Sequence, residues 1–158
     1  MKKILLLAIG FLMTMTASAQ FEQGKYYCNG SLTGINLSYS GAEKLSLGVE
    51  AKGGYLVADN WMALVMAGYS HDEDVDDKFA VGVGGRYYII QNGLYMGLNA
   101  RLVHGGSGYN DIMPGLELGY AFFLGKSVTI EPSVYYDQSI KNHSDYSKVG
   151  LRIGVGVY

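Results

Sequence analysis

Charged side chains stand in the middle of segments that otherwise alternate between apolar and polar residues. In residues 45–57, "LSLGVEAKGGYLV", the odd positions are apolar or glycine, whereas Glu50 and Lys52 occupy even positions. Carboxylates and cations in such surroundings can form ion pairs, carry a proton or line a pore. Because a buried charge persists only when it is paired and hydrogen-bonded, these side chains are expected to face opposite charges within the fold.

Seven charged residues of this kind lie at a similar distance from the same end of their segments. Each lies four to seven residues from the end of its segment that carries a tight turn or the C-terminal residue; they are Glu50, Lys52, Arg86, Arg101, Glu117, Glu131 and Arg152. In tilted strands this spacing corresponds to roughly 10–18 Å, a single belt. Three carboxylates and four cations in one belt predict an interlocked salt-bridge network with a structural role. The alternative is a gated or proton-linked pore lined by the same charges.

Other residues whose side chains could bind a metal or take part in catalysis lie in polar links between the segments. His71, His104 and His143 could bind a metal or act as a base if they clustered. The link "HDEDVDD" (71–77) carries alternate aspartates, but it lacks the glycine and glutamate that an EF-hand calcium loop needs. It offers at most a loose divalent-cation contact, shared with lipopolysaccharide phosphates. Solvated loop residues are the simpler interpretation for both sets.

One link offers a hydrolase-like combination. In "HGGSGYND", His104, Ser107 and Asp111 contain the residue types of a nucleophile, base and orienter set. Sequence order alone does not place these groups together. "GVGGR" (82–86) is not a nucleotide motif, because it lies inside a predicted strand and no helix follows. We therefore predict that the protein is not an enzyme and holds no cofactor or catalytic metal.

The elements that position the belt are predicted to be strands, because two-residue alternation dominates after residue 20. Eight segments alternate: 25–39, 44–57, 61–70, 78–90, 94–103, 111–123, 127–137 and 147–158. Most are longer than the five or six residues of an average strand and suit the about 9–11 of a membrane-spanning strand. Tight turns at 58–60, 91–93 and 124–126 alternate with longer polar links, which is typical of an outer-membrane barrel.

The alternation also predicts which side chains face lipid. In strands 4 to 8 one face is apolar and free of charge, and the opposite face holds glycines and the belt charges. Strand 3, "WMALVMAGYS", is apolar on both faces; we expect Trp61, Ala63, Val65, Ala67 and Tyr69 to point outward so that aromatic residues lie at both rims. The phase of strand 1 changes near Gly34, which predicts a bulge.

The first residues indicate export. Lys2 and Lys3 precede an apolar run, and Ala17-Ser18-Ala19 fits a cleavage site, so 1–19 is predicted to be a signal peptide and 20–158 the mature domain. Cys28 is the only cysteine and cannot form an internal disulfide. Removing the two leading lysines leaves 10 basic and 14 acidic residues, a net charge of −4. No basic patch suggests nucleic-acid binding.

The mature chain resembles the small eight-stranded outer-membrane β-barrel family, the OmpA-like and porin-family barrels. The resemblance is carried by "GKYYCNGSLTG", "GGYLVADNWMALVMAGYS" and "VGVGGRYYI", in that order, and by the terminal aromatic of "GLRIGVGVY". It implies short periplasmic turns, a charged interior and assembly by the barrel-assembly machinery through the C-terminal strand. Tyr158 departs from this pattern, because it is out of step with the apolar face of Val155 and Val157.

Together these features predict an all-β, eight-stranded, antiparallel up-and-down transmembrane barrel in the outer membrane of a Gram-negative bacterium. Side chains just fill the interior of an eight-stranded barrel, so Tyr95, Asn99, Tyr135 and the belt are expected to plug the lumen. A monomeric structural or surface-interacting protein in contact with lipopolysaccharide is the preferred function. The alternatives are a narrow or gated channel, a lipid-modifying enzyme, and a soluble exported barrel with an internal ligand.

Overall fold

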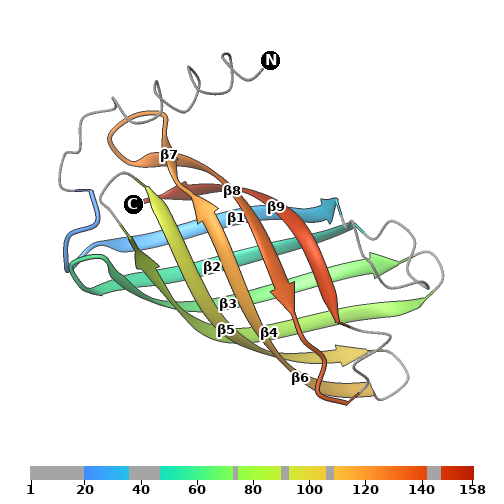
Figure 1. The fold of residues 1–158 in the computed structure, drawn as a ribbon. Coiled ribbons are helices and arrows are strands. Elements are labelled where there is room, and N and C mark those ends of the chain that lie inside the picture. Colours follow the sequence, from blue (N-terminus) through green and yellow to red (C-terminus); the bar gives the residue numbers. More distant parts are fainter. Residues whose placement is uncertain (1–19, 36–46, 73–74, 90–92, 106–108, 142–146) are drawn as a thin grey trace, which may run out of the picture.

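The structure is a computed structural model that describes residues 20–35, 47–72, 75–89, 93–105, 109–141 and 147–158. Within these ranges, no helix is long and apolar enough to cross a membrane. All the regular elements are strands that wrap around a common axis, as Figure 1 shows. The predicted signal peptide lies outside the described residues.

Nine strands follow one another along the described parts of the chain. Their bounds are β1 (Tyr26–Ile35), β2 (Leu47–Ala58), β3 (Trp61–Asp72), β4 (Val75–Tyr88), β5 (Leu94–Gly105), β6 (Tyr109–Tyr120), β7 (Phe122–Phe123), β8 (Val128–Asp137) and β9 (Lys148–Val157). Each strand from β1 to β5 pairs with the next strand along the chain in antiparallel register.

The sheet closes into a barrel through β8 and β9. β9 pairs with both β8 and β1. β6 and β7 are two parts of one wall strand, interrupted at Ala121, because both pair with β8. The wall therefore has eight strands, all antiparallel, and this confirms the predicted fold class. Closure joins the two edges of the sheet, as a β-structure in lipid requires. The first part of β6, before Gly115, extends past the pairing with β8.

Alternation places the strand side chains outside and inside in turn. On β3, Trp61 and Val65 are exposed on the outer wall, whereas Met62 and Met66 are buried in the lumen. The predicted orientation of this strand is thus confirmed. The bulge predicted at Gly34 is also confirmed, since the β1–β9 register shifts between Thr33 and Ile35.

Two connections differ from the prediction. The polar links at 71–77 and 104–110 were expected to be loops, but β3 and β4 extend to Asp72 and from Val75, and β5 and β6 extend to Gly105 and from Tyr109. Polar side chains favour loops in sequence analysis, yet they do not prevent backbone pairing. These hairpins therefore continue the wall beyond its apolar band. We call this end of the barrel the loop end.

The opposite end, the turn end, holds the β2–β3, β4–β5 and β7–β8 connections. Asn60 completes the β2–β3 turn with a φ of 66°, a left-handed conformation that asparagine tolerates better than most residues. Aromatic pairs lie on the outer wall near this end, including Trp61 against Tyr87 with ring centroids 4.7 Å apart. Such pairs are typical of the aromatic girdle at a membrane interface.

Side chains from both ends of the described chain fill the lumen at the turn end. Phe21 is fully buried and stacks on Tyr88 with ring centroids 3.6 Å apart. Its carbonyl accepts a hydrogen bond from the Asn60 amide at 2.9 Å. Tyr158 points inward and packs against Phe21 and Tyr27. We call Phe21, Tyr27, Tyr88 and Tyr158 the aromatic cluster.

Candidate functional site

The lumen above the aromatic cluster contains the belt charges. The structure brings all seven sequence-predicted residues into this space, on strands β2, β4, β5, β6, β8 and β9. Six of the seven are buried, and only the Arg101 side chain keeps slight exposure, at 12%. No two of the seven residues are direct partners in an interstrand pair, so charges on different strands meet inside the lumen.

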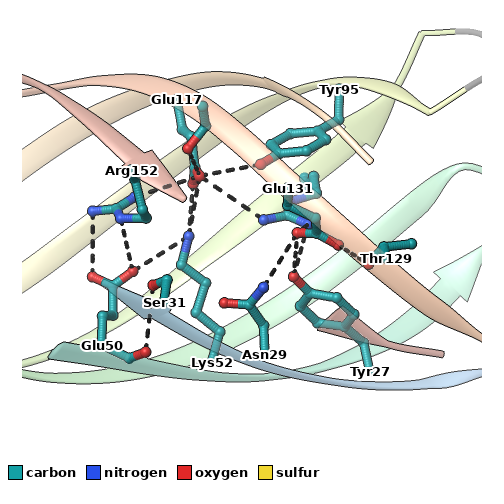
Figure 2. Close-up of polar contacts among 12 residues, drawn as sticks. Tyr27, Asn29, Ser31, Glu50, Lys52, Tyr95, Glu117, Thr129, Glu131 and Arg152 are labelled. Carbon is teal, nitrogen blue, oxygen red and sulfur yellow. Dashed lines mark hydrogen bonds and ion pairs between the residues drawn. The ribbon is translucent and has the colours of Figure 1, made fainter. Parts of the chain in front are cut away.

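One part of the network is centred on Lys52. Its ammonium lies 2.9 Å from Glu117 Oε2 and 3.3 Å from Glu50 Oε1. Figure 2 draws Lys52 between these two carboxylates. Arg152 joins the same two carboxylates, with Nε 3.3 Å from Glu50 Oε1 and Nη1 3.4 Å from Glu117 Oε1. Two carboxylates thus alternate with two cations, so that each charge has two opposite neighbours.

Arg101 extends this part toward the loop end. Its Nη2 lies 3.0 Å from Glu50 Oε2, and its Nη1 lies 3.0 Å from Asp137 Oδ2. Asp137 is a member of the network that the sequence prediction missed. The two-residue period could have identified it, since Asp137 has the same parity as Glu131 on β8. However, Asp137 is the last residue of its predicted strand and borders a polar link.

A second part is centred on Glu131, closer to the turn end. Arg86 Nη1 lies 3.0 Å from Glu131 Oε2, and Tyr27 donates a hydrogen bond to the same oxygen at 2.5 Å. Thr129 and Tyr158 donate to Oε1 at 2.8 and 3.2 Å. Glu131 therefore joins the aromatic cluster to the charges.

Arg86 is held by rings as well as by charge. Its guanidinium carbon lies 3.8 Å from the centroid of the Tyr95 ring and 5.2 Å from that of Tyr27. Cation–π contacts of this kind stabilise a desolvated guanidinium. Arg86 Nη2 also lies 4.0 Å from Glu117 Oε1, which connects the two parts of the network.

Glycines make room for the tyrosine rings that surround the charges. Gly150 lies opposite Tyr135 in the β8–β9 pair, and a Cβ added to it would come within 2.5 Å of the Tyr135 hydroxyl oxygen. The ring can lie flat along the wall only because the side chain is missing. In that position the ring packs against the Arg152 guanidinium, whose carbon is 4.3 Å from the ring centroid.

Four carboxylates and four cations make the network neutral once Asp137 is included. Such a set can hold strands in register, because each pair joins residues distant in sequence. Within the described ranges, no group of three or more histidine, cysteine or acidic side chains is arranged to hold a metal ion. Cys28 is a free thiol exposed on the outer wall.

The structure separates the residues of the hydrolase-like combination. His104 is exposed, and its Nδ1 lies 2.6 Å from Asn110 Oδ1. Asp111 is buried in the lumen, where it accepts hydrogen bonds from the Ser139 hydroxyl and the Ile112 amide. His104 and Asp111 thus face opposite sides of the wall. Ser107, His143 and the side chains of 71–77 lie outside the described residues.

No protein-family model and no curated protein matches the sequence. Solved structures do match the fold. The crystal structure of Neisserial surface protein A has 16% identity and a TM-score of 0.60, over 84% of this chain and 96% of that chain. A de novo designed transmembrane beta-barrel has 15% identity and a TM-score of 0.55, over 86% and 97%. Ail, the attachment invasion locus protein of Yersinia pestis, has 13% identity and a TM-score of 0.49, over 86% and 98%.

At these identities the likeness establishes the fold alone. The first two matches cover 84% and 86% of this chain and nearly all of their own, so the correspondence extends over most of the barrel. The protein has the fold of the small eight-stranded outer-membrane β-barrels.

Proposed function

We propose that the protein is an integral outer-membrane barrel, exported by a cleaved signal peptide, whose lumen is closed by the charge network. Its role is structural or surface-interacting and does not involve catalysis. We further infer that it functions as a monomer and that its relatives are OmpA-like or porin-family barrels. The observation that carries the proposal is the reversal of polarity: charges are buried inside and apolar side chains are exposed outside.

The outer wall supports insertion into a bilayer. Leu98, Val65 and Leu116 are exposed to 66%, 60% and 55% in the middle of their strands. Soluble proteins rarely expose a contiguous apolar surface of more than a few hundred Å², whereas a band of this kind matches the lipid-facing surface of a membrane barrel. Lipid is therefore the partner that we propose for this surface, with lipopolysaccharide at the loop end.

The side chains in the lumen support the proposal that ions cannot pass through the barrel. Ions crossing it would have to pass the paired charges of the belt and then the stacked rings of Phe21 and Tyr88. Each belt cation already lies within 4.0 Å of a carboxylate. A passing ion would have to separate these pairs in surroundings where separated charges are costly.

Assembly is proposed to proceed through the barrel-assembly machinery. The final residue, Tyr158, is turned into the lumen, which explains why it is out of step with Val155 and Val157. The assembly machinery would therefore recognise the outward apolar face of β9, because the ring of Tyr158 points into the lumen.

Fractionation followed by electrophoresis tests the location. We expect the protein in the outer-membrane fraction, and we expect its unboiled detergent extract to migrate differently from the boiled extract. Recovery in the soluble periplasmic fraction would contradict the proposal and would favour a soluble exported barrel.

Conductance in planar bilayers tests the closed lumen. We expect no unitary currents from the purified wild-type protein, because both the belt and the aromatic cluster obstruct the path. Glu117→Ala and Arg86→Ala serve as comparison variants. Regular wild-type currents that either substitution alters would support the channel alternative and would overturn the closed lumen.

A further inference from the structure

An apolar groove of about 570 Å³ lies on the outer wall near the loop end. Its floor includes two rows of side chains that run across β4, β5 and β6. The row nearer the middle of the wall is Val81, Leu102 and Ile112, which are neighbours in register. The volume falls within the range of ligand pockets, about 300–1,000 Å³.

The second row is closer to the loop end and more polar. It consists of Phe79, His104 and Asn110, again neighbours in register. His104 and Asn110 contact each other through their side chains at 2.6 Å, and both are exposed. The groove thus changes from apolar to polar toward the rim, which suits an amphiphile whose head lies at the membrane surface.

The side of the groove is formed by Ile140 and Lys141, which follow β8. Hydrogen bonds hold this segment in place: the Gln138 amide donates to the Pro114 carbonyl at 2.8 Å, and the Lys141 amide donates to Asp111 Oδ1 at 3.3 Å. Ser139 also donates to Asp111. Since Asp111 is buried and receives these donors, the groove has a fixed side and does not depend on a ligand to form it.

We propose that this groove binds one acyl chain of a phosphate-bearing glycolipid of the lipid A type, with a phosphate beside Lys141 and His104. The inference rests on the proposed function, because the groove meets such a lipid only if the loop end faces the outer leaflet. Lys141 is exposed at the rim and supplies positive charge, and the His104 ring supplies a hydrogen-bonding nitrogen. The Asp111 carboxylate is buried on the lumenal side of the wall, whereas His104 is exposed on the outer side.

Native mass spectrometry of the detergent-solubilised protein tests the proposal, with purified diphosphoryl lipid A as the probe. We expect one lipid to remain bound. Ile112→Trp fills the groove and should weaken binding about tenfold or more. Leu116→Trp is the matched control, because Leu116 faces lipid on the same strand outside the groove.

The phosphate is tested by charge reversal. Lys141→Glu should weaken lipid A binding several-fold and leave binding of the dephosphorylated lipid unchanged, whereas Lys126→Glu, exposed at the turn end, should change neither. Equal binding by the Ile112→Trp and Leu116→Trp variants would overturn the groove. Equal binding of the two lipids to the wild-type protein would overturn the phosphate contact.

Each variant is also checked for heat-modifiable migration and membrane fractionation. A membrane-inserted protein with no groove-dependent binding contradicts this inference alone. A wild-type protein that does not insert contradicts the proposed function as well.

Discussion

Arg86 is 1% exposed, one of the most deeply buried side chains of the lumen. It contacts Glu131 directly, and three tyrosine side chains lie around it. Replacing an entire buried pair by apolar groups is often tolerated, but removing one partner leaves an uncompensated charge. Single and double substitutions at this pair should therefore behave differently.

We predict that Arg86→Met lowers the free energy of unfolding by about 3–5 kcal/mol, because Glu131 loses its nearest cation. The measurement is a urea titration of the refolded protein in detergent, followed by gel migration and circular dichroism. Lys126→Met, at an exposed position, is the control and should change little. Adding Glu131→Leu to Arg86→Met should cost less than the sum of the single effects. Strict additivity would show that the pair is not coupled.

At the scale of the elements, the packing between paired strands depends on where glycine leaves space for a side chain of the neighbouring strand. Tyr135 on β8 and Gly150 on β9 are directly opposite, and the ring occupies the space above the glycine. Covering a strand glycine with a neighbouring aromatic ring restores packing that the glycine alone would lose. The same arrangement positions Arg152 in the network.

Gly150→Ala is expected to destabilise the barrel by about 1–3 kcal/mol, the usual cost of overpacking. Its new Cβ would lie 2.7 Å from Tyr135 Cε1. In a Tyr135→Ala background the same change should have little effect, because the ring is absent. Gly30→Ala is the control, since apart from the neighbouring residues in the chain no atom lies within 4 Å of the added Cβ. Thermal unfolding in detergent measures all four variants, and an undiminished effect without the ring would refute the explanation.

The number and order of the strands could be predicted because lipid outside and charge inside impose a strict two-residue period. Parity alone placed Glu50 and Lys52 on the lumenal face. The strand ends at 71–77 and 104–110 could not be predicted, since beyond the apolar band the period no longer reports on pairing. Tyr158 has the parity of Arg152, so the same period places it on the lumenal face. Its packing against Phe21 could not be predicted, because no periodic pattern connects residues from the two ends of the barrel sequence.

At the scale of the whole molecule, location in a bilayer decides what a surface residue costs. Leu98 lies in the middle of β5, and Leu124 lies in the β7–β8 connection. Their exposed fractions are nearly equal, 66% and 67%. In water the two positions would therefore respond similarly to a charge.

In a bilayer they should respond differently. Leu98→Arg is expected to destabilise the protein folded in vesicles by about 2–4 kcal/mol, the cost of an arginine near the bilayer midplane, and Leu124→Arg by about 1 kcal/mol or less. Equilibrium folding into phosphatidylcholine vesicles, read from circular dichroism and gel migration, measures both. Equal effects at the two positions would contradict the assignment of the outer wall to lipid.

The ion pairs of the lumen also constrain how the barrel can form. Lys52 and Glu117 are 65 residues apart, and Glu50 and Arg152 are 102 residues apart. A partly assembled sheet would carry both sets of charges without their partners, and in lipid such a state is strongly disfavoured. The final β1–β9 pairing therefore satisfies many interactions at once. Insertion and closure are expected to occur as one cooperative transition, without a stable half-formed sheet in the membrane.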